Sequence, residues 1–423
     1  MDHFELQNGA LHAEDVPLGE IAREVGTPVY VYSRATLTRH ARVFREALSA
    51  LPSVHIAFAV KSNPNLAVLH LLASEGYGAD VVSEGEMRRA LAAGIPAANI
   101  VYSGVGKKMA ELREAVQAGI RQINVESRAE LDTLNAVARE LGRRVDIAIR
   151  VNPDVDAKTH AKITTGRKEN KFGVDIDLAR ETYAHAGSKP NLQVVGVAMH
   201  IGSQILSLEP YRDAIRKLRG LVGDLRSDGH RIKRLDLGGG YGIVYRHESN
   251  ERPFAVNDYM DMVRQETAGL DCALSFEPGR SLVGNAGLLL GEVILVKPGT
   301  ARTFVIVDTA MNDLIRPTLY EAWHDIVPVR QPADGAATVL TDIVGPICES
   351  GDYLAQNRPM PPLAAGDLVA VKSAGAYGAV MSSTYNTRPL VPEVLADGDR
   401  YEIVRPRQSL DELIAADRVP NWL

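Results

Sequence analysis

The sequence predicts an α/β protein in which a parallel (β/α)₈ barrel resembling the TIM barrel is followed by an all-β domain. Between residues 54 and 280, short apolar runs rich in β-branched residues alternate with longer amphipathic runs. Eight short runs are present, and eight strands close a barrel of about 250 residues. After Arg280 the strand-like runs continue while helical patterns become few. An open doubly wound sheet is the alternative for the first part.

The eight predicted barrel strands share an apolar composition and end near polar or glycine-rich segments. They are Val54–Val60, Gly78–Val82, Asn99–Ser103, Gln122–Val125, Val145–Val151, Val194–His200, Arg234–Leu237 and Cys272–Glu277. The amphipathic runs between them predict helices, among them Asn65–Glu75, Glu84–Ala93, Lys108–Ala118, Arg128–Leu141 and Tyr211–Ser227. Two of these helices are expected to begin with capping boxes, formed by the pairs Ser83 with Glu86 and Ser127 with Glu130.

The β domain is expected to combine both ends of the chain. Its predicted strands after the barrel are Leu288–Val296, Thr303–Val307, Thr338–Val344 and Leu368–Ser373. The strand-like run Pro28–Tyr32 precedes the barrel, and we expect it to join this domain because chain ends often meet in space. The expected domains are therefore residues 35–280 for the barrel, and residues 1–34 with 281–423 for the β domain.

Composition excludes several classes of protein. The 423 residues are 45% hydrophobic and 24% charged, as in ordinary globular proteins, with a net charge of −6. This balance argues against nucleic acid or an anionic membrane as a partner. No apolar run is long enough to cross a membrane, and the acidic start does not resemble a secretory signal. The only cysteines, Cys272 and Cys348, make no disulfide framework, so we expect a cytoplasmic protein.

Reactive residue types gather where the predicted barrel strands end. Barrel enzymes carry their chemistry at the carboxyl ends of the strands, and six of the eight predicted ends carry polar or glycine-rich groups. They are Lys61-Ser62-Asn63, Ser83-Glu84-Gly85-Glu86, Arg150, His200-Ile201-Gly202-Ser203-Gln204, Gly238-Gly239-Gly240 and Glu277-Pro278-Gly279-Arg280. We expect these groups to converge on one mouth of the barrel.

Lys61 is the candidate nucleophile of this mouth. It follows the apolar run 56–60, so we expect burial to desolvate its ammonium, lower its pKa and make the amine nucleophilic. A lysine amine condenses with carbonyl groups, and pyridoxal phosphate attaches to proteins in this way. A surface lysine at a strand end is the alternative.

Three further features fit such a cofactor. Gly238-Gly239-Gly240 has no Cβ atoms that would keep a phosphate from the backbone N–H groups, although a flexible turn is the alternative. Glu277 suits a pyridine nitrogen. His200 could lie flat on the ring, or could be a satisfied buried histidine. No metal-ligand spacing such as His-Glu-x-x-His is present, and we expect no metal.

Four of these segments together resemble the fold-type III pyridoxal-phosphate enzymes, which include alanine racemase and the ornithine and diaminopimelate decarboxylases. The segments are Phe58-Ala59-Val60-Lys61-Ser62-Asn63, His200–Gln204, the triple glycine and Glu277–Arg280. Others resemble the diaminopimelate decarboxylase family in particular. They are Thr165-Gly166 with Lys171-Phe172-Gly173, Met311-Asn312-Asp313-Leu314-Ile315-Arg316-Pro317 with Tyr320, Gly345-Pro346-Ile347-Cys348-Glu349-Ser350-Gly351-Asp352, and Gly375-Ala376-Tyr377-Gly378. The resemblance runs from about Pro28 to Pro389.

The resemblance implies a role for each site residue. It implies that Lys61 holds pyridoxal phosphate as a Schiff base and that Cys348 donates a proton after CO₂ leaves. The other implied cofactor-binding residues are Asp80, His200, Ser203, Gly239, Gly240, Glu277, Pro278, Gly279, Arg280 and Tyr377. The implied substrate-binding residues are Arg280, Arg316 and Tyr320 for a distal carboxylate, Glu349 for a distal amino group, and Tyr377.

The implied reaction is decarboxylation of meso-2,6-diaminopimelate to L-lysine, the last step of lysine biosynthesis. The two arginines favour a dicarboxylate, because a guanidinium binds a carboxylate through two parallel hydrogen bonds. The resemblance also implies a homodimer, in which Cys348 and Glu349 reach the active site of the partner subunit. Three alternatives remain: a decarboxylase of ornithine, arginine or a carboxylated polyamine, a racemase, and a non-catalytic homologue. His160–Asn170 is the candidate lid.

Overall fold

The computed structural model describes residues 2–157, 165–166, 170–300, 302–333 and 335–423. The predicted lid, His160–Asn170, therefore lies outside the described residues apart from Thr165, Gly166 and Asn170. The chain divides into two compact units. One, the barrel unit, contains His40–Ile243 and Glu251–Ser281, and the other, the β unit, contains Met1–Arg39, Val244–Asn250 and Leu282–Leu423.

The barrel unit contains the predicted closed parallel barrel. Its strands are β5 (Val54–Ala59), β6 (Gly78–Val81), β7 (Ile100–Tyr102), β8 (Gln122–Val125), β9 (Val145–Asn152), β11 (Leu192–Ala198), β12 (Arg234–Asp236) and β13 (Ala273–Phe276). Each strand pairs in parallel with the next, and β13 pairs with β5 to close the ring. A short additional strand, β10 (Val174–Asp175), pairs with β9. The open-sheet alternative is therefore wrong, and the predicted strands differ from the observed ones only at their ends.

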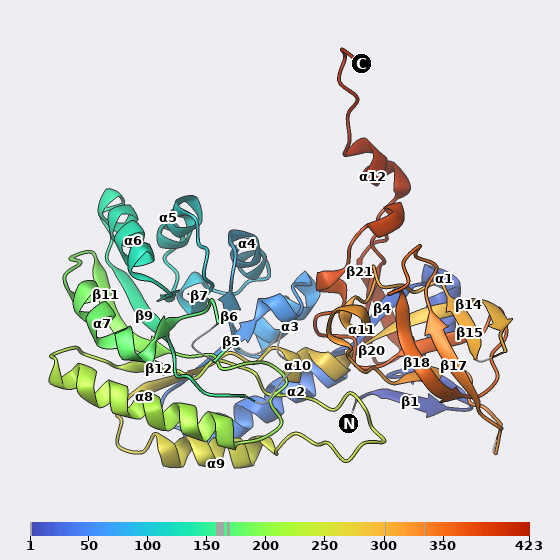
Figure 1. Ribbon diagram of the computed structural model, residues 1–423, viewed down its shortest axis with the longest axis horizontal. Coiled ribbons are helices and arrows are strands. Elements are labelled where there is room, and N and C mark those ends of the chain that lie inside the picture. The colour runs from blue at the N-terminus through green and yellow to red at the C-terminus, as the bar shows by residue number, and fades with distance from the viewer. Residues whose placement is uncertain (1, 158–164, 167–169, 301, 334) are drawn as a thin grey trace. The chain divides into compact units, whose positions relative to one another are not determined.

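Helices surround the barrel strands in Figure 1. They are α3 (Leu66–Ser74), α4 (Glu84–Ala92), α5 (Met109–Ala118), α6 (Arg128–Glu140), α7 (Ala179–Gly187), α8 (Glu209–Ser227) and α9 (Val256–Glu266). The buried faces of α6 and α8 carry leucine, valine and alanine at helical spacing, which is the amphipathic pattern that predicted them.

The two predicted capping boxes form with one change. The hydroxyl of Ser83 accepts the N–H of Glu86, and that of Ser127 accepts the N–H of Glu130. Each glutamate carboxylate returns to the residue before the cap, at Val82 and at Glu126, instead of to the cap itself. The extended backbone of the cap residue turns its own N–H away, so the preceding N–H is the one within reach.

The β unit is built around the long strand β14 (Gly287–Pro298). This strand pairs with β4 (Val29–Ser33) and β19 (Leu368–Val371) near its start and with β15 (Thr303–Val307) near its end. The other strands of the sheet are β16 (Ile326–Pro328), β17 (Val339–Val344), β18 (Tyr353–Met360), β20 (Glu393–Asp397) and β21 (Arg400–Arg405). The prediction that the N-terminal strand joins this sheet is confirmed, because β4 pairs with both β14 and β20.

Several elements of the β unit were not predicted. They include the strands β16, β18, β20 and β21, and the sheet of β1 (Phe4–Gln7), β2 (Ala10–Ala13) and β3 (Val16–Pro17), with α1 (Leu18–Val25) and α12 (Leu410–Ala415). A further helix, α2 (Arg34–Ala47), leads to the barrel. The short strands and α1 are held by a common core in which Phe4, Leu11 and Ile21 pack with Val31 and Leu288.

In the part of the chain that the structure describes, no helix is long and apolar enough to cross a membrane.

Candidate active site

Lys61 lies at the carboxyl end of β5, in a 3₁₀ turn, η2 (Val60–Ser62). Its ammonium donates to Oδ2 of Asp80 at 2.6 Å. The Asp80 side chain is fully buried at the end of β6, whereas that of Lys61 is 33% exposed. The side chain of Lys61 is therefore only partly buried, and its ammonium is paired with a buried carboxylate.

A cavity of about 440 Å³ opens beside Lys61 in the barrel unit. His200 and Glu277, at the ends of β11 and β13, also line it. Among the other lining residues are Ser103, Asn124, Arg150, Thr165 and Phe172. This volume suits a small organic molecule, and four of the six predicted strand-end groups, those with Lys61, Arg150, His200 and Glu277, contribute to its lining.

The carboxyl group of Glu277 belongs to a buried polar network. It hydrogen-bonds to the carboxyl group of Asp236, the last residue of β12. Asp236 also accepts the N–H of Gly238 at 3.0 Å and the amide of Asn124 at 3.4 Å. Burial, and then the charges of Asp236 and Asp80, raise the pKa of Glu277 well above its ordinary value. A hydrogen bond between two carboxyl groups needs a proton between them, and the raised pKa of Glu277 favours such a proton on this pair.

His200 presents a neutral ring to the cavity. Burial, and then the charges of Arg150 and Lys61, lower the pKa of its imidazole well below the ordinary value. Its Nδ1 atom accepts the N–H of Gly239 at 3.2 Å, so the hydrogen of the neutral ring lies on Nε2. The hydrogen bond fixes the orientation of the ring, which can therefore offer a flat, uncharged face to a ligand.

The triple glycine allows three strand ends to pack closely. A Cβ atom on Gly239 would lie 2.1 Å from the carbonyl oxygen of Glu277, and one on Gly240 would lie 2.5 Å from that of Gly202. Gly240 also has a φ of 104°, which favours glycine. These glycines are thus required by contacts within the protein, a reason that the sequence interpretation did not include. Close to them in sequence, Ser203 accepts a hydrogen bond from Arg280 at 3.0 Å.

The loop after β13 packs on the turn that carries Lys61. The carbonyl of Pro278 accepts the N–H of Ala59 at 3.0 Å. A Cβ atom on Gly279 would lie 3.0 Å from Oγ of Ser62. The structure therefore brings the Glu277–Arg280 segment beside the lysine.

The residues of this mouth fit pyridoxal phosphate. Oε1 of Glu277 is buried and receives no N–H or O–H hydrogen from any described residue, which is the acceptor that a protonated pyridine nitrogen needs. Lys61 supplies an amine and His200 a flat neutral ring on the same cavity. Among the described residues, no group of three or more His, Cys, Asp or Glu could hold a metal ion.

The β unit holds three of the predicted substrate residues, with Cys348, on two connected segments. Arg316 and Tyr320 are the first and last residues of α11 (Arg316–Tyr320). The loop that carries Cys348 and Glu349 is tied to this helix by Thr318, whose hydroxyl donates to the carbonyl of Gly351 at 2.7 Å. The helix and the loop therefore form one assembly within the β unit.

Asp352 holds the Cys348 loop in shape. Its carboxylate accepts the N–H groups of Met311 and Ile347, both at 2.7 Å. The N–H of Cys348 donates to the side chain of Asn386 at 3.0 Å. Cys348 and Glu349 are themselves exposed, so the backbone of the loop is fixed while its reactive side chains face outward.

Tyr377 lies in a turn with unusual backbone geometry. Its φ is 56°, in the left-handed region that a residue with a side chain seldom occupies. The turn is confined by its glycines, because a Cβ atom on Gly375 would lie 2.0 Å from the carbonyl oxygen of Val283. The packing of Gly375 therefore fixes where Tyr377 is placed.

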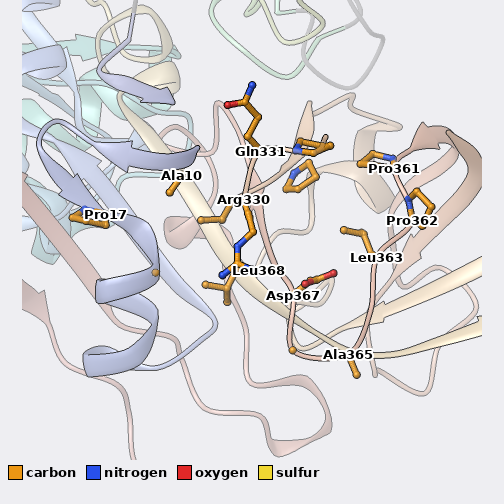
Figure 2. A pocket seen from close by; sticks show the side chains of 15 residues that line it. Ala10, Pro17, Arg330, Gln331, Pro361, Pro362, Leu363, Ala365, Asp367 and Leu368 are labelled. Atoms are coloured by element: carbon orange, nitrogen blue, oxygen red, sulfur yellow. The ribbon is translucent and has the colours of Figure 1, made fainter. Parts of the chain in front are cut away.

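A second cavity, of about 540 Å³, lies within the β unit. Figure 2 shows Pro361, Pro362 and Leu363 on one side of it, Ala10 and Pro17 on the other, and Arg330 between them. None of the predicted site residues, all of which the structure describes, lines this cavity.

Four residues with a direct bearing on the site were not predicted. In the barrel, Asp236 contacts both Glu277 and Asn124. In the β unit, Arg316 is contacted by Tyr245 and His324. A polar residue within a barrel strand, as in Arg234-Leu235-Asp236, was the available signal for Asp236. No local pattern could have identified Tyr245, which lies 71 positions before Arg316 in the sequence.

The barrel and its mouth define a class: a pyridoxal-phosphate-dependent decarboxylase. Comparison with known families agrees, since the family described as "Pyridoxal-dependent decarboxylase, pyridoxal binding domain" matches residues 34–284. The chain is 51% identical over 417 residues to diaminopimelate decarboxylase from Pseudomonas aeruginosa, and 48% identical over 422 residues to that from Zymomonas mobilis. Each alignment covers 99% of both chains.

Solved structures give the same result. Diaminopimelate decarboxylase from M. jannaschii in complex with L-lysine has a TM-score of 0.94 and 35% identity, over 99% of this chain and 98% of that one. The Helicobacter pylori enzyme with L-lysine has a TM-score of 0.89 and 39% identity, over 94% and 98%. The chain belongs to the diaminopimelate decarboxylase family. It is therefore a pyridoxal-phosphate-dependent decarboxylase.

Proposed function

We propose that this chain decarboxylates meso-2,6-diaminopimelate at the barrel cavity, with Lys61 as the residue that holds the cofactor. The observation that carries the proposal is the lining of the cavity, which places the amine of Lys61, the ring of His200 and the carboxyl group of Glu277 around about 440 Å³. When bound there, pyridoxal phosphate accepts the electron pair that departing CO₂ leaves behind.

Each barrel residue has a proposed task. Asp80 orients the amine of Lys61 and accepts its proton. Glu277 keeps a proton at the pyridine nitrogen, with the proton that it shares with Asp236 as the source. His200 covers one face of the ring. The phosphate is held by the remaining group: Ser203, Gly239, Gly240, Pro278, Gly279 and Arg280.

Residues of the β unit, together with Arg280 of the barrel unit, supply selectivity for the substrate. We assign Arg280, Arg316 and Tyr320 to the distal carboxylate, Glu349 to the distal ammonium, and Tyr377 to both cofactor and substrate. A guanidinium is suited to a carboxylate because it offers two parallel N–H groups. A diamine has no carboxylate at that position, so these residues favour the dicarboxylate over ornithine.

Cys348 is the proposed proton donor, and the active site is proposed to be shared by two subunits. The thiol of Cys348 protonates the carbon atom that has lost CO₂. The exposure of Cys348 and Glu349 on a rigid loop suits residues that act on a second copy of the chain in a homodimer. Both cysteines are free, which suits a cytoplasmic protein.

The test is to incubate purified protein and pyridoxal phosphate separately with meso-diaminopimelate, ornithine and arginine. Released CO₂ and the amino-acid or amine product are measured. We expect CO₂ and L-lysine in equal amounts from diaminopimelate alone. A faster release of CO₂ from ornithine or arginine would replace the proposal with the rival decarboxylase, and a change of stereochemistry without CO₂ would indicate a racemase.

A further inference from the structure

Arg316 is held by a buried histidine. The guanidinium is 6% exposed, and its Nη1 atom lies 2.7 Å from Nε2 of His324, which is fully buried. The other ring nitrogen of His324, Nδ1, lies 2.8 Å from the carbonyl oxygen of Lys372. A carbonyl can only accept, so Nδ1 carries the hydrogen and Nε2 accepts from Arg316.

This contact orients the guanidinium without neutralising it. A protonated imidazole has two N–H donors and could not accept from Arg316, so the geometry requires the neutral ring. A neutral acceptor fixes one N–H of the guanidinium and contributes no negative charge. The charge of Arg316 is therefore not reduced by His324 and can attract an anionic ligand.

Tyr245 holds the guanidinium from a second direction. The central carbon of the Arg316 guanidinium lies 4.4 Å from the centre of the Tyr245 ring, within the range of a cation–π contact. The same ring packs edge-on against His324, with ring centres 5.2 Å apart and an interplanar angle of 77°. Tyr245 and His324 thus fix both the plane and an edge of the guanidinium.

We propose that His324 and Tyr245 are positioning residues that aim Arg316 at a carboxylate at the far end of the ligand. They thereby set selectivity for amino acids that carry this carboxylate over diamines that lack it. The proposal rests on the role of Arg316 in the proposed function and adds the residues that make Arg316 selective. It predicts that their loss weakens ligands with the distal carboxylate and spares ligands without it.

Two inhibitors separate this role from a general structural one. L-lysine has a carboxylate, and cadaverine is the same chain without it. Inhibition constants of both are measured on the cofactor-loaded enzyme for the variants His324→Leu, His324→Gln and Tyr245→Leu. We expect His324→Leu and Tyr245→Leu to weaken L-lysine by about ten- to a hundredfold, as misplacement of a binding group does. Cadaverine inhibition and the cofactor absorbance stay unchanged.

His324→Gln serves as the rescue, since its amide oxygen can accept from Arg316, and we expect it to restore most of the affinity for L-lysine. His12→Leu is the matched control, because His12 is another buried histidine of the β unit that contacts a backbone carbonyl, that of Ala10 at 3.0 Å. It should leave both inhibitors unaffected. If His324→Leu does not fold, Tyr245→Leu gives the same test while keeping the hydrogen bond between His324 and Arg316.

Arg316→Leu separates a failure of the proposed role of Arg316 from a failure of the roles of His324 and Tyr245 alone. If it leaves L-lysine inhibition unchanged, Arg316 does not bind the carboxylate, and both its role and this inference fail. If Arg316→Leu weakens L-lysine while the His324 and Tyr245 variants do not, only the inference fails. Equal weakening of L-lysine and cadaverine would also overturn it, because that result indicates a structural role.

Discussion

The barrel unit and the β unit hold their functional residues in different ways. In the barrel, Lys61, Asp80 and Glu277 lie at the ends of paired strands, where the register of the sheet fixes their positions. In the β unit, Arg316 and Cys348 lie on a five-residue helix and a loop, which are fixed by side chains such as His324 and Asp352. In the proposed function, strand ends therefore carry the cofactor residues, and a short helix and a loop held by buried polar groups carry residues for the substrate.

The largest expected effect on activity comes from a substitution in the barrel. Lys61→Ala should abolish the absorbance of the lysine-bound cofactor and all turnover, because no other group on the cavity supplies a primary amine among the lining residues. Absorption spectra and CO₂ release check this. Lys189→Ala, which removes a lysine paired with Asp132 on α6, is the control. A variant at Lys61 that kept the band would remove the central residue of the barrel site.

The second prediction tests whether loss of Cys348 in the β unit lowers turnover while cofactor binding in the barrel stays intact. Cys348→Ala should leave the cofactor absorbance intact and lower kcat by about a hundred- to ten-thousandfold, the usual contribution of a general acid. Cys272→Ala is the matched control, since Cys272 contacts the carbonyls of Ile232 and Leu270 away from the cavity lining. An unchanged kcat for Cys348→Ala would exclude its role as proton donor.

The third prediction concerns a buried acid of the β unit. Burial raises the pKa of Asp313 to about 7. The folded protein then binds a proton more tightly than the unfolded chain, so this contribution to stability is present below about pH 4 and is lost as the pH rises through 7. A rise of about three units corresponds to about 4 kcal/mol.

Asp313→Asn should flatten the pH dependence of stability by that amount. The measurement is denaturant unfolding of the intact chain at several values between pH 4 and 8. The Asn variant keeps an acceptor for the N–H of Ala310, which Asp313 accepts at 2.9 Å. An unaltered slope would show that Asp313 is ionised in the folded protein throughout this range.

The smallest effect lies in the carboxyl pair of the barrel. Asp236→Asn removes a negative charge that raises the pKa of Glu277. The pKa of Glu277 should therefore fall, and its protonated form should disappear at a lower pH in cofactor-free protein. Infrared absorption of the protonated carboxyl group follows this titration directly. A midpoint that did not move would mean that Glu277 and Asp236 do not share a proton.

The same comparison explains what the sequence could predict. Alternating runs predicted the barrel because each strand and helix carries its own periodicity. Polar residues after those runs predicted Lys61 and Glu277, since parallel strands place their carboxyl ends together. The N-terminal strand β4 was also expected to join the β domain, because its run is strand-like and chain ends often meet in space. The sheet of β1 to β3 was not predicted, because strands of two to four residues carry too little pattern.

Contacts between distant segments explain the remaining failures. The pairing of Lys61 with Asp80 was not predicted, and no local property of either segment indicates how exposed the lysine is. His324 and Tyr245 approach Arg316 from separate parts of the β unit. Such residues become visible only when the folded chain brings them together.

The most direct test of the central claim is a mixed dimer in which one subunit carries Lys61→Ala and the other Cys348→Ala, isolated with two different affinity tags. If the barrel of one subunit works with the loop of the other, the mixed dimer contains one complete site of two. It should then release CO₂ from meso-diaminopimelate at about half the wild-type rate per dimer, as two-fold symmetry requires. A mixed dimer as inactive as either single variant would contradict the shared site.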